Sequence, residues 1–203
     1  NIGVYYSNGT ASGPVTNGSE IELTGKNGVG IYAADGIILE NSKNITSATS
    51  DNIASYVGGD STLTSNGTIT MSGANNIGIY AGKGTGRNAG TIDLTGASGT
   101  SVGMVAQAVA GETATIENAT GKEIKVGANL GMYIAGTGTS KGINRGTITA
   151  TTGTGVYIED SGNSFDGTGG TIKSDKVGIY LKDTTAGTVL VTVPAVVSFR
   201  YIP

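Results

Sequence analysis

Short runs in which apolar and polar residues alternate recur along the chain, and the most regular of them has the form Gly-apolar-Tyr. With two degenerate copies included, Ala54-Ser55-Tyr56 and Gly103-Met104-Val105, successive copies begin 27, 24, 24, 25, 28, 24 and 23 residues apart. Each run is about four residues long and is bounded by Gly, Asn, Asp or Ser, which is typical of a short β-strand. The complete copies are Gly3-Val4-Tyr5, Gly30-Ile31-Tyr32, Gly78-Ile79-Tyr80, Gly131-Met132-Tyr133, Gly155-Val156-Tyr157 and Gly178-Ile179-Tyr180.

A second motif keeps the same period out of phase with the first. It is centred on an isoleucine, with intervals of 24, 24, 23, 32, 24 and 24 residues, at Ile21, Ile45, Ile69, Ile92, Ile124, Ile148 and Ile172. A third, shorter element precedes it and ends in Asn, as in Leu39-Glu40-Asn41 and Ile116-Glu117-Asn118. Independent motifs that hold one period over many copies indicate a repeat architecture.

The length of the repeat predicts the fold. Three short strands and three turns use about two dozen residues, which is one circuit of a triangular coil, and stacked coils bury what one coil cannot bury alone. Leucine-rich repeats need a leucine scaffold that is missing here, and propeller blades need about 40 residues each. We therefore expect an all-β, right-handed, single-stranded parallel β-helix (a β-solenoid) of about eight coils of about 24 residues. The repeats are expected over residues 1–183, with residues 184–203 forming a non-repeat C-terminal cap or tail.

Strand alternation predicts which side chains face outward. In Val29-Gly30-Ile31-Tyr32-Ala33 it places Val29, Ile31 and Ala33 in the core and Gly30 and Tyr32 outside. The outward tyrosines should form a ladder, broken at Val105, which consists of Tyr5, Tyr32, Tyr56, Tyr80, Tyr133, Tyr157 and Tyr180. Such a ladder either stabilises a sheet face through cross-strand contacts or serves as a contact platform for a glycan or a protein.

Two further columns are expected from the repeat. Outward threonine pairs such as Thr68 and Thr70 resemble an ice-binding array, but Glu20 and Glu22 occupy the same columns and favour an ordinary solvated face. Asparagines that precede the second motif are expected to hydrogen-bond along the axis at a coil corner. They are Asn41, Asn66, Asn88, Asn118 and Asn144.

Composition argues against most kinds of chemistry. The chain lacks Cys, His and Trp, and its net charge is −3, which disfavours thiolate or histidine metal sites and nucleic-acid partners. Glu159-Asp160 is the only adjacent acidic pair, and neighbouring strand residues point to opposite faces, so a glycosidase carboxylate pair is not expected. We expect no catalytic residue, cofactor or metal site. No apolar run approaches the length of a membrane helix, so no membrane insertion by this segment is expected.

One interval departs from the period. Between Ile92 and Ile124 the spacing is 32 residues, and most of the excess is expected around Gln107–Thr113. Insertions in solenoids become loops that often carry binding. Gln107, Val109 and Glu112 are therefore candidate binding residues, and the alternative is a passive loop.

The repeats resemble those of a known family. Asn88-Ala89-Gly90-Thr91-Ile92-Asp93-Leu94 and Asn76-Ile77-Gly78-Ile79-Tyr80-Ala81 are similar to the passenger repeats of large autotransporter adhesins of fusobacterial type. The resemblance covers about residues 1–183, and no family binding residue can be carried over. It implies a non-enzymatic adhesin or stalk segment, displayed at the cell surface from the outer membrane of a Gram-negative bacterium. Its implied partner is a glycan or protein on host cells or other bacteria.

Two other functions are left open by the sequence. A self-associating rod could stack end to end into fibres, although a monomer is expected, and a polysaccharide-binding or polysaccharide-degrading β-helix is a third alternative. The tail, from Thr188 to Pro203, lacks the repeat signature and could cap the last coil or pair with a neighbouring molecule.

Overall fold

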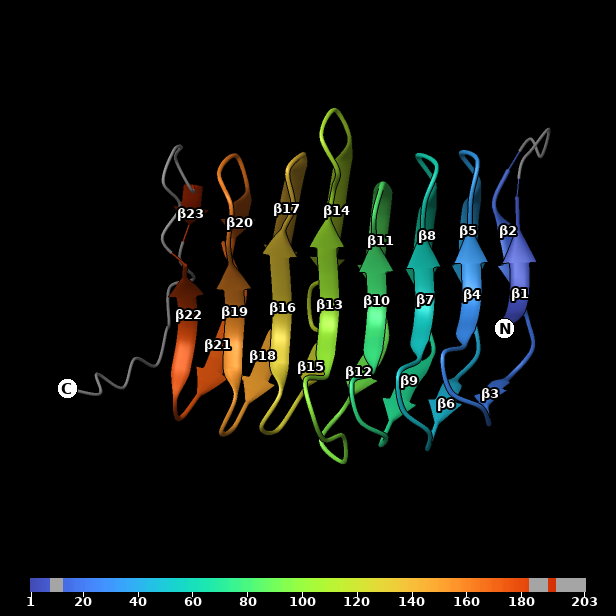
Figure 1. Cartoon of the computed structure of the whole chain (residues 1–203), viewed down its shortest axis with the longest axis horizontal. Helices are drawn as coiled ribbons and strands as arrows, with labels where there is room; N and C mark the ends of the chain where they lie inside the picture. Colours follow the sequence, from blue (N-terminus) through green and yellow to red (C-terminus); the bar gives the residue numbers. More distant parts are fainter. Residues whose placement is uncertain (8–12, 183–189, 193–203) are drawn as a thin grey trace.

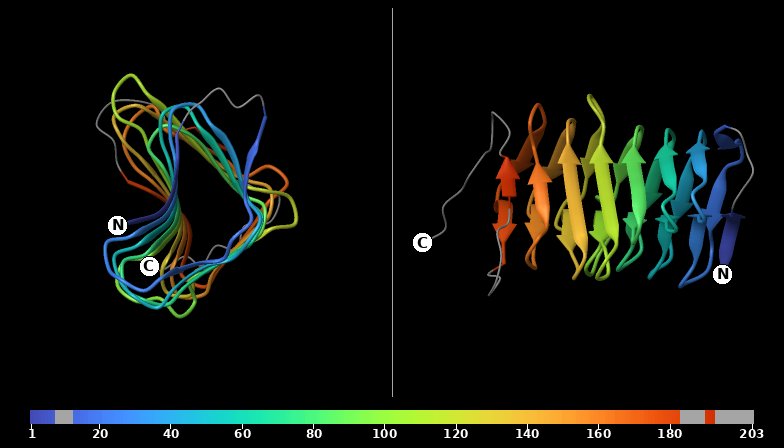
Figure 2. Two further views of the ribbon diagram at one scale, coloured as in Figure 1. Left: turned by 90° about the vertical axis from the view of Figure 1, so that its right-hand side faces the viewer. Right: turned by 90° about the horizontal axis from the view of Figure 1, so that it is seen from above.

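The computed structural model describes residues 1–7, 13–182 and 190–192, and the regular structure of these residues consists of β-strands alone. The strands form three parallel sheets of eight, eight and seven strands, here named sheets A, B and C. Neighbours within a sheet are three strands apart in sequence, so the chain visits A, B and C once in every circuit (Figure 1). Together, Figures 1 and 2 show that the chain winds in a right-handed sense around a roughly triangular cross-section.

The strand bounds follow the three sequence motifs. Sheet A holds the Gly-apolar-Tyr copies, in β1 (Ile2–Tyr6), β4 (Val29–Ala33), β7 (Ile53–Val57), β10 (Ile77–Ala81), β13 (Val102–Gln107), β16 (Leu130–Ala135), β19 (Thr154–Ile158) and β22 (Val177–Leu181). Sheet B holds β2 (Val15–Asn17), β5 (Ile38–Asn41), β8 (Thr62–Ser65), β11 (Gly84–Asn88), β14 (Thr113–Asn118), β17 (Thr139–Asn144), β20 (Ser164–Asp166) and β23 (Leu190–Thr192). Sheet C holds β3 (Ile21–Leu23), β6 (Ile45–Ser47), β9 (Thr68–Met71), β12 (Thr91–Asp93), β15 (Glu123–Lys125), β18 (Thr147–Ala150) and β21 (Thr171–Ser174).

The predicted β-solenoid is confirmed. Sheet C has seven strands, so the described chain completes about seven turns, with an eighth strand in sheets A and B, against the eight coils expected. Most of the predicted tail, residues 184–203, lies outside the described residues. Its described strand, β23, pairs in parallel with β20 and so adds one more strand to sheet B.

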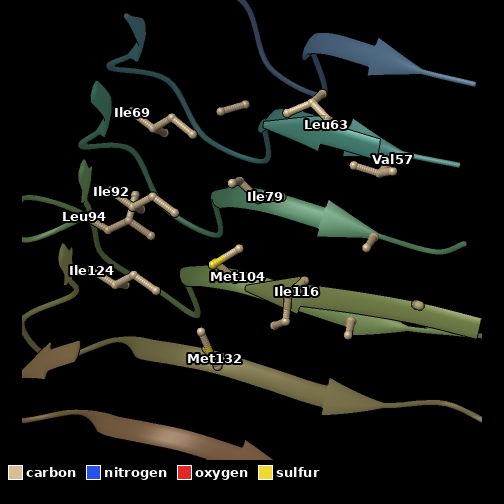
Figure 3. Packing of buried hydrophobic residues seen from close by; sticks show 14 of the residues in the cluster. Val57, Leu63, Ile69, Ile79, Ile92, Leu94, Met104, Ile116, Ile124 and Met132 are labelled. Carbon is tan, nitrogen blue, oxygen red and sulfur yellow. The ribbon is translucent and has the colours of Figure 1, made fainter. Parts of the chain in front are cut away.

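Columns of identical or similar residues form the core. The central isoleucines of sheet C lie in register from coil to coil, and each is buried. Figure 3 shows Ile69, Ile92 and Ile124 as one such column, facing Ile79, Met104 and Met132 of sheet A. Burying aliphatic side chains in this way stabilises the fold by about 1.5–3 kcal/mol for each side chain. Stacking therefore supplies the core that one coil lacks.

The predicted orientation of Val29 and Gly30 is wrong. Gly30 is buried and a Cβ on it would lie 3.3 Å from Cγ2 of Ile45, so this residue faces the core, as does Ile31. Val29 is half-exposed and lies outside the core cluster. Two consecutive inward residues require a bend, and Figure 2 shows the strands of sheet A bending toward the interior. Strict alternation holds for straight strands, and it resumes at Ile31, Tyr32 and Ala33.

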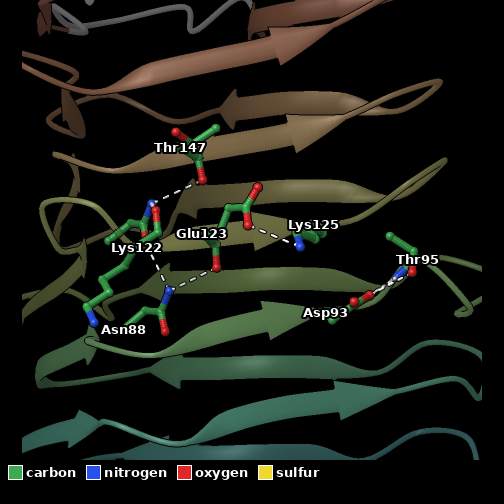
Figure 4. Close-up of polar contacts among 8 residues, drawn as sticks. Asn88, Asp93, Thr95, Lys122, Glu123, Lys125 and Thr147 are labelled. Atoms are coloured by element: carbon green, nitrogen blue, oxygen red, sulfur yellow. Dashed lines mark hydrogen bonds and ion pairs between the residues drawn. The ribbon is translucent and has the colours of Figure 1, made fainter.

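The asparagine column inside the coil corner is confirmed except at Asn66. Nδ2 of Asn88 donates to Oδ1 of Asn118 at 2.8 Å, and Nδ2 of Asn118 donates to Oδ1 of Asn144 at 2.9 Å. The buried amides also donate to backbone carbonyls, as Asn88 does to Glu123 (Figure 4). In the third coil Ser65 holds the column position, and Asn66 follows it in the exposed turn.

Candidate interaction face

The tyrosine ladder runs along the outer face of sheet A, as the sequence predicts. The first four rings stack, with centroids 5.2, 4.6 and 5.0 Å apart from Tyr5 to Tyr80. A second group follows Val105, in which Tyr157 and Tyr180 stack at 4.9 Å, whereas Tyr133 and Tyr157 are tilted by 55°. Because each stacked ring covers the face of the next, the stacks present ring edges and hydroxyls to solvent.

An aliphatic column accompanies the ladder three residues earlier in each strand. It includes Val29, Ile53 and Ile77, which are half-exposed. On the hydroxyl side, Gly58 and Gly82 follow the strands, and a Cβ on Gly58 would lie 3.3 Å from the hydroxyl oxygen of Tyr32. These small residues leave the ring edges uncovered. The N-terminal part of the face is therefore an uncharged strip of aliphatic and aromatic groups.

At the position where the ladder lacks a tyrosine, the space is occupied by other side chains. Val105 aligns with Tyr80 on one side and Tyr133 on the other, and only 3% of its surface is exposed. The hydroxyl of Tyr80 donates to Oε1 of Gln107 at 3.2 Å. No open slot for a ligand ring therefore remains at this position.

The second tyrosine group is held by a charged network. The hydroxyl of Tyr133 donates to the carboxylate of Glu159, which also pairs with Nζ of Lys182 at 2.8 Å. Burial raises the pKa of Tyr133 well above the ordinary phenol range, and the hydrogen bond to Glu159 raises it further. Hydrogen bonds from Lys182 and Tyr133 lower the pKa of Glu159. The phenol of Tyr133 therefore stays protonated at neutral pH, and its contact with Glu159, together with the Glu159–Lys182 ion pair, ties three successive coils.

The three candidate loop residues have separate positions. Gln107 ends strand β13 and binds Tyr80, so it belongs to the tyrosine face. Glu112 pairs with Lys83 at 2.8 Å, and Lys83 also pairs with Asp60 at 3.1 Å, which ties the turn to the rod. Val109 is 66% exposed at the tip. The turn at 108–112 has five residues against two at 82–83, and the turns at 94–101 and 119–122 have eight and four residues against five and two one coil earlier. The extra residues are therefore spread over three turns, and the expectation that most of them lie around Gln107–Thr113 is wrong.

The outer face of sheet C is polar, as expected. Thr70 aligns with Asp93, and Asp93 with Lys125, so charges interrupt the threonine columns. Asp93 accepts hydrogen bonds from Thr95, and Lys125 pairs with Glu123 at 3.1 Å (Figure 4). This face offers no regular flat array.

A second polar column was missed by the sequence reasoning. Side-chain oxygens of Asn52, Asn76, Ser101 and Asn129 each accept a backbone N–H from the coil before, at 2.6 to 3.3 Å. These residues precede the strands of sheet A. The recurrence of Asn or Ser just before the Gly-apolar-Tyr motif was the available signal.

No family model, curated protein or solved structure matches the chain. Within residues 1–7, 13–182 and 190–192, no group of three or more carboxylates is placed to hold a metal ion. The same residues contain no helix long and apolar enough to cross a membrane.

Proposed function

We propose that this chain is a non-enzymatic adhesive rod, a segment of a bacterial surface protein, and that the outer face of sheet A is its contact surface. The observation that carries the proposal is the pair of tyrosine stacks on one face from Tyr5 to Tyr180, with a partly exposed aliphatic column beside the N-terminal stack. Tyrosine is enriched in interface cores and charged residues are depleted there, which matches the uncharged N-terminal strip.

The cellular setting of the proposal comes from the resemblance to autotransporter passengers. On this proposal the segment lies outside the cell, displayed from the outer membrane of a Gram-negative bacterium, with host cells or other bacteria as targets. A solenoid suits this role because stacked coils form a rigid spacer whose faces repeat along the axis. The active species is proposed to be a monomer.

The test uses the fluorescently labelled chain on panels of epithelial cells and bacteria. Tyr56→Ala removes the ring at the centre of the first stack and is expected to weaken binding by about tenfold, as for a buried interface aromatic. Tyr56→Phe keeps the stack and reports on the hydroxyl alone. Thr64→Ala, on sheet B of the same coil, is the matched control and should bind like the wild type.

Two outcomes would contradict the proposal. One is binding that is indifferent to Tyr56→Ala while circular dichroism shows the variant folded. The other is scattered light that rises steeply with protein concentration, since this would favour the self-associating rod.

A further inference from the structure

A hollow opens on the outer side of sheet A, at the corner where the chain passes from sheet C into sheet A. Its volume of about 330 Å³ lies in the range of sites that hold one small ligand. Four successive coils line it, so the site exists only when the coils are stacked. Its main contributors are Gly99–Ser101, Leu130, Thr152–Thr154, Tyr157 and Lys176.

Unequal turns create this hollow. The turn between β12 and β13 spans eight residues, 94–101, whereas the turns that lead into β19 and β22 span three and two. The long turn extends beyond its neighbours at this corner in Figure 1 and forms one wall. Thr154 stands in the column that Val29, Ile53, Ile77 and Leu130 fill with aliphatic groups. The floor is therefore lower and more polar here than along the rest of the face.

The polar groups in the wall are free to bind. The hydroxyls of Thr100, Thr152 and Thr154 make no hydrogen bond to another described residue, and all three side chains are at least partly exposed. Asn129, by contrast, is engaged, because its Nδ2 donates to the carbonyl of Ala97 at 2.9 Å. The three threonines thus offer donors and acceptors that no other part of the described chain uses.

One aromatic ring and one cation complete the wall. The ring of Tyr157 is tilted by 55° from that of Tyr133, with centroids 5.6 Å apart, so this side of the ring is not covered by a stacked neighbour as in the first tyrosine group. Lys176 is the one charged residue of the lining. It is exposed and forms no ion pair within the described residues.

We infer that this hollow binds an acidic sugar residue, a pyranose that carries a carboxylate. Its hydroxyls match the three threonines, its apolar face matches Tyr157 and Leu130, and its carboxylate matches Lys176. The inference rests on the proposed function, because it names the ligand class for the same face. Uronic acids of bacterial polysaccharides and sialic acids of host glycans share this chemistry.

The test measures binding of the whole chain to three oligosaccharides by calorimetry. One carries a terminal sialic acid, one a uronic acid, and the third is a neutral oligosaccharide matched in length. At least one acidic oligosaccharide should bind about tenfold more tightly than the neutral one, the size expected for one charge-assisted contact. The acid that is preferred identifies the source.

Variants assign the binding to the hollow. Lys176→Met should abolish the preference for the acidic sugar, and Thr154→Val, of similar shape, should weaken binding severalfold. Lys173→Met removes the same charge from the exposed face of sheet C, outside the hollow, and should leave binding unchanged. Equal losses in Lys173→Met and Lys176→Met would overturn the inference, as would equal binding of neutral and acidic oligosaccharides.

The two proposals fail differently. Cell binding that is lost in Tyr56→Ala, together with no affinity for either acidic oligosaccharide, refutes the sugar site and leaves the adhesive rod standing. Acidic sugar bound through Lys176, with no binding to any cell or bacterium in the panel, refutes the adhesive role.

Discussion

Gly103 lies where a sheet A strand bends into the core, and its missing side chain matters. A Cβ there would lie 2.6 Å from the carbonyl oxygen of Gly131 and 2.6 Å from Cγ2 of Ile124. Gly103→Ala should therefore lower the free energy of unfolding by about 1–3 kcal/mol, since neighbouring coils have to separate locally. Urea denaturation measures the effect. Gly18→Ala is the control, because nothing lies within 4 Å of that Cβ, and equal midpoints for both variants would contradict the packing argument.

Ser55 is the opposite case, because replacing it should stabilise the fold. It aligns with Ile31 and Ile79 in the core, is fully buried, and its hydroxyl has no hydrogen-bond partner. Val156 shows that valine fits this column elsewhere in the rod. Ser55→Val should raise the free energy of unfolding by about 1–2 kcal/mol, because it removes an unpaired polar group and adds apolar contact. A lower thermal midpoint would show that the hydroxyl has a partner after all.

The stacked phenols make stability depend on alkaline pH. Burial raises the pKa values of Tyr32, Tyr56 and Tyr80, and neighbouring phenols add to the shift for the first two. The unfolded chain loses its phenol protons near about pH 10, whereas the folded chain holds them to higher pH. The contribution of these phenols to the free energy of unfolding is therefore complete below that pH and falls as pH rises above it. Urea midpoints at about pH 8 and pH 11, with phenolate absorbance, test this. Tyr56→Phe should reduce the alkaline loss, and an unchanged loss would contradict the assignment.

At the scale of strands, the sequence predicted the period, the three strands per coil and the alignment of the tyrosines, because each of these depends on recurrence alone. The prediction of side-chain orientation failed at Val29 and Gly30. Alternation assumes a straight strand, whereas the bend in sheet A turns both Gly30 and Ile31 inward. Sequence reasoning also missed the hollow beside Tyr157, which depends on how far one turn projects past its neighbours. Turn projection is a property of the stacked coils and has no periodic signal.

The asparagine column ties one coil corner to the next, and Asn118 lies near its centre. Its amide donates to Asn144 and its carbonyl oxygen accepts from Asn88, both inside the fully buried column. Asn118→Leu, of similar volume, removes both of these hydrogen bonds and leaves Oδ1 of Asn144 without its donor, so it should lower the free energy of unfolding by about 2–4 kcal/mol. Asn118→Ser should cost less, since Ser65 holds the same position two coils earlier. A loss for Asn118→Ser as large as that for Asn118→Leu in urea denaturation would contradict the hydrogen-bond argument.

At the scale of the whole rod, each coil contacts mainly its two neighbours, so a coil should be removable as a unit. Ile45 and Ile69 are register partners 24 residues apart, and deletion of residues 45–68 joins Asn44 to Ile69 with every column still aligned. Circular dichroism should show that this deletion variant keeps its β-structure. The slope of its unfolding free energy against urea concentration should fall by roughly one part in seven, because less surface is exposed on unfolding.

Deletion of residues 45–56 alone removes about half a coil and would carry strands of one sheet into the position of another, so that variant should aggregate. If both deletions gave the same soluble, cooperative unfolding, the stacking of equivalent positions would not be what specifies this fold.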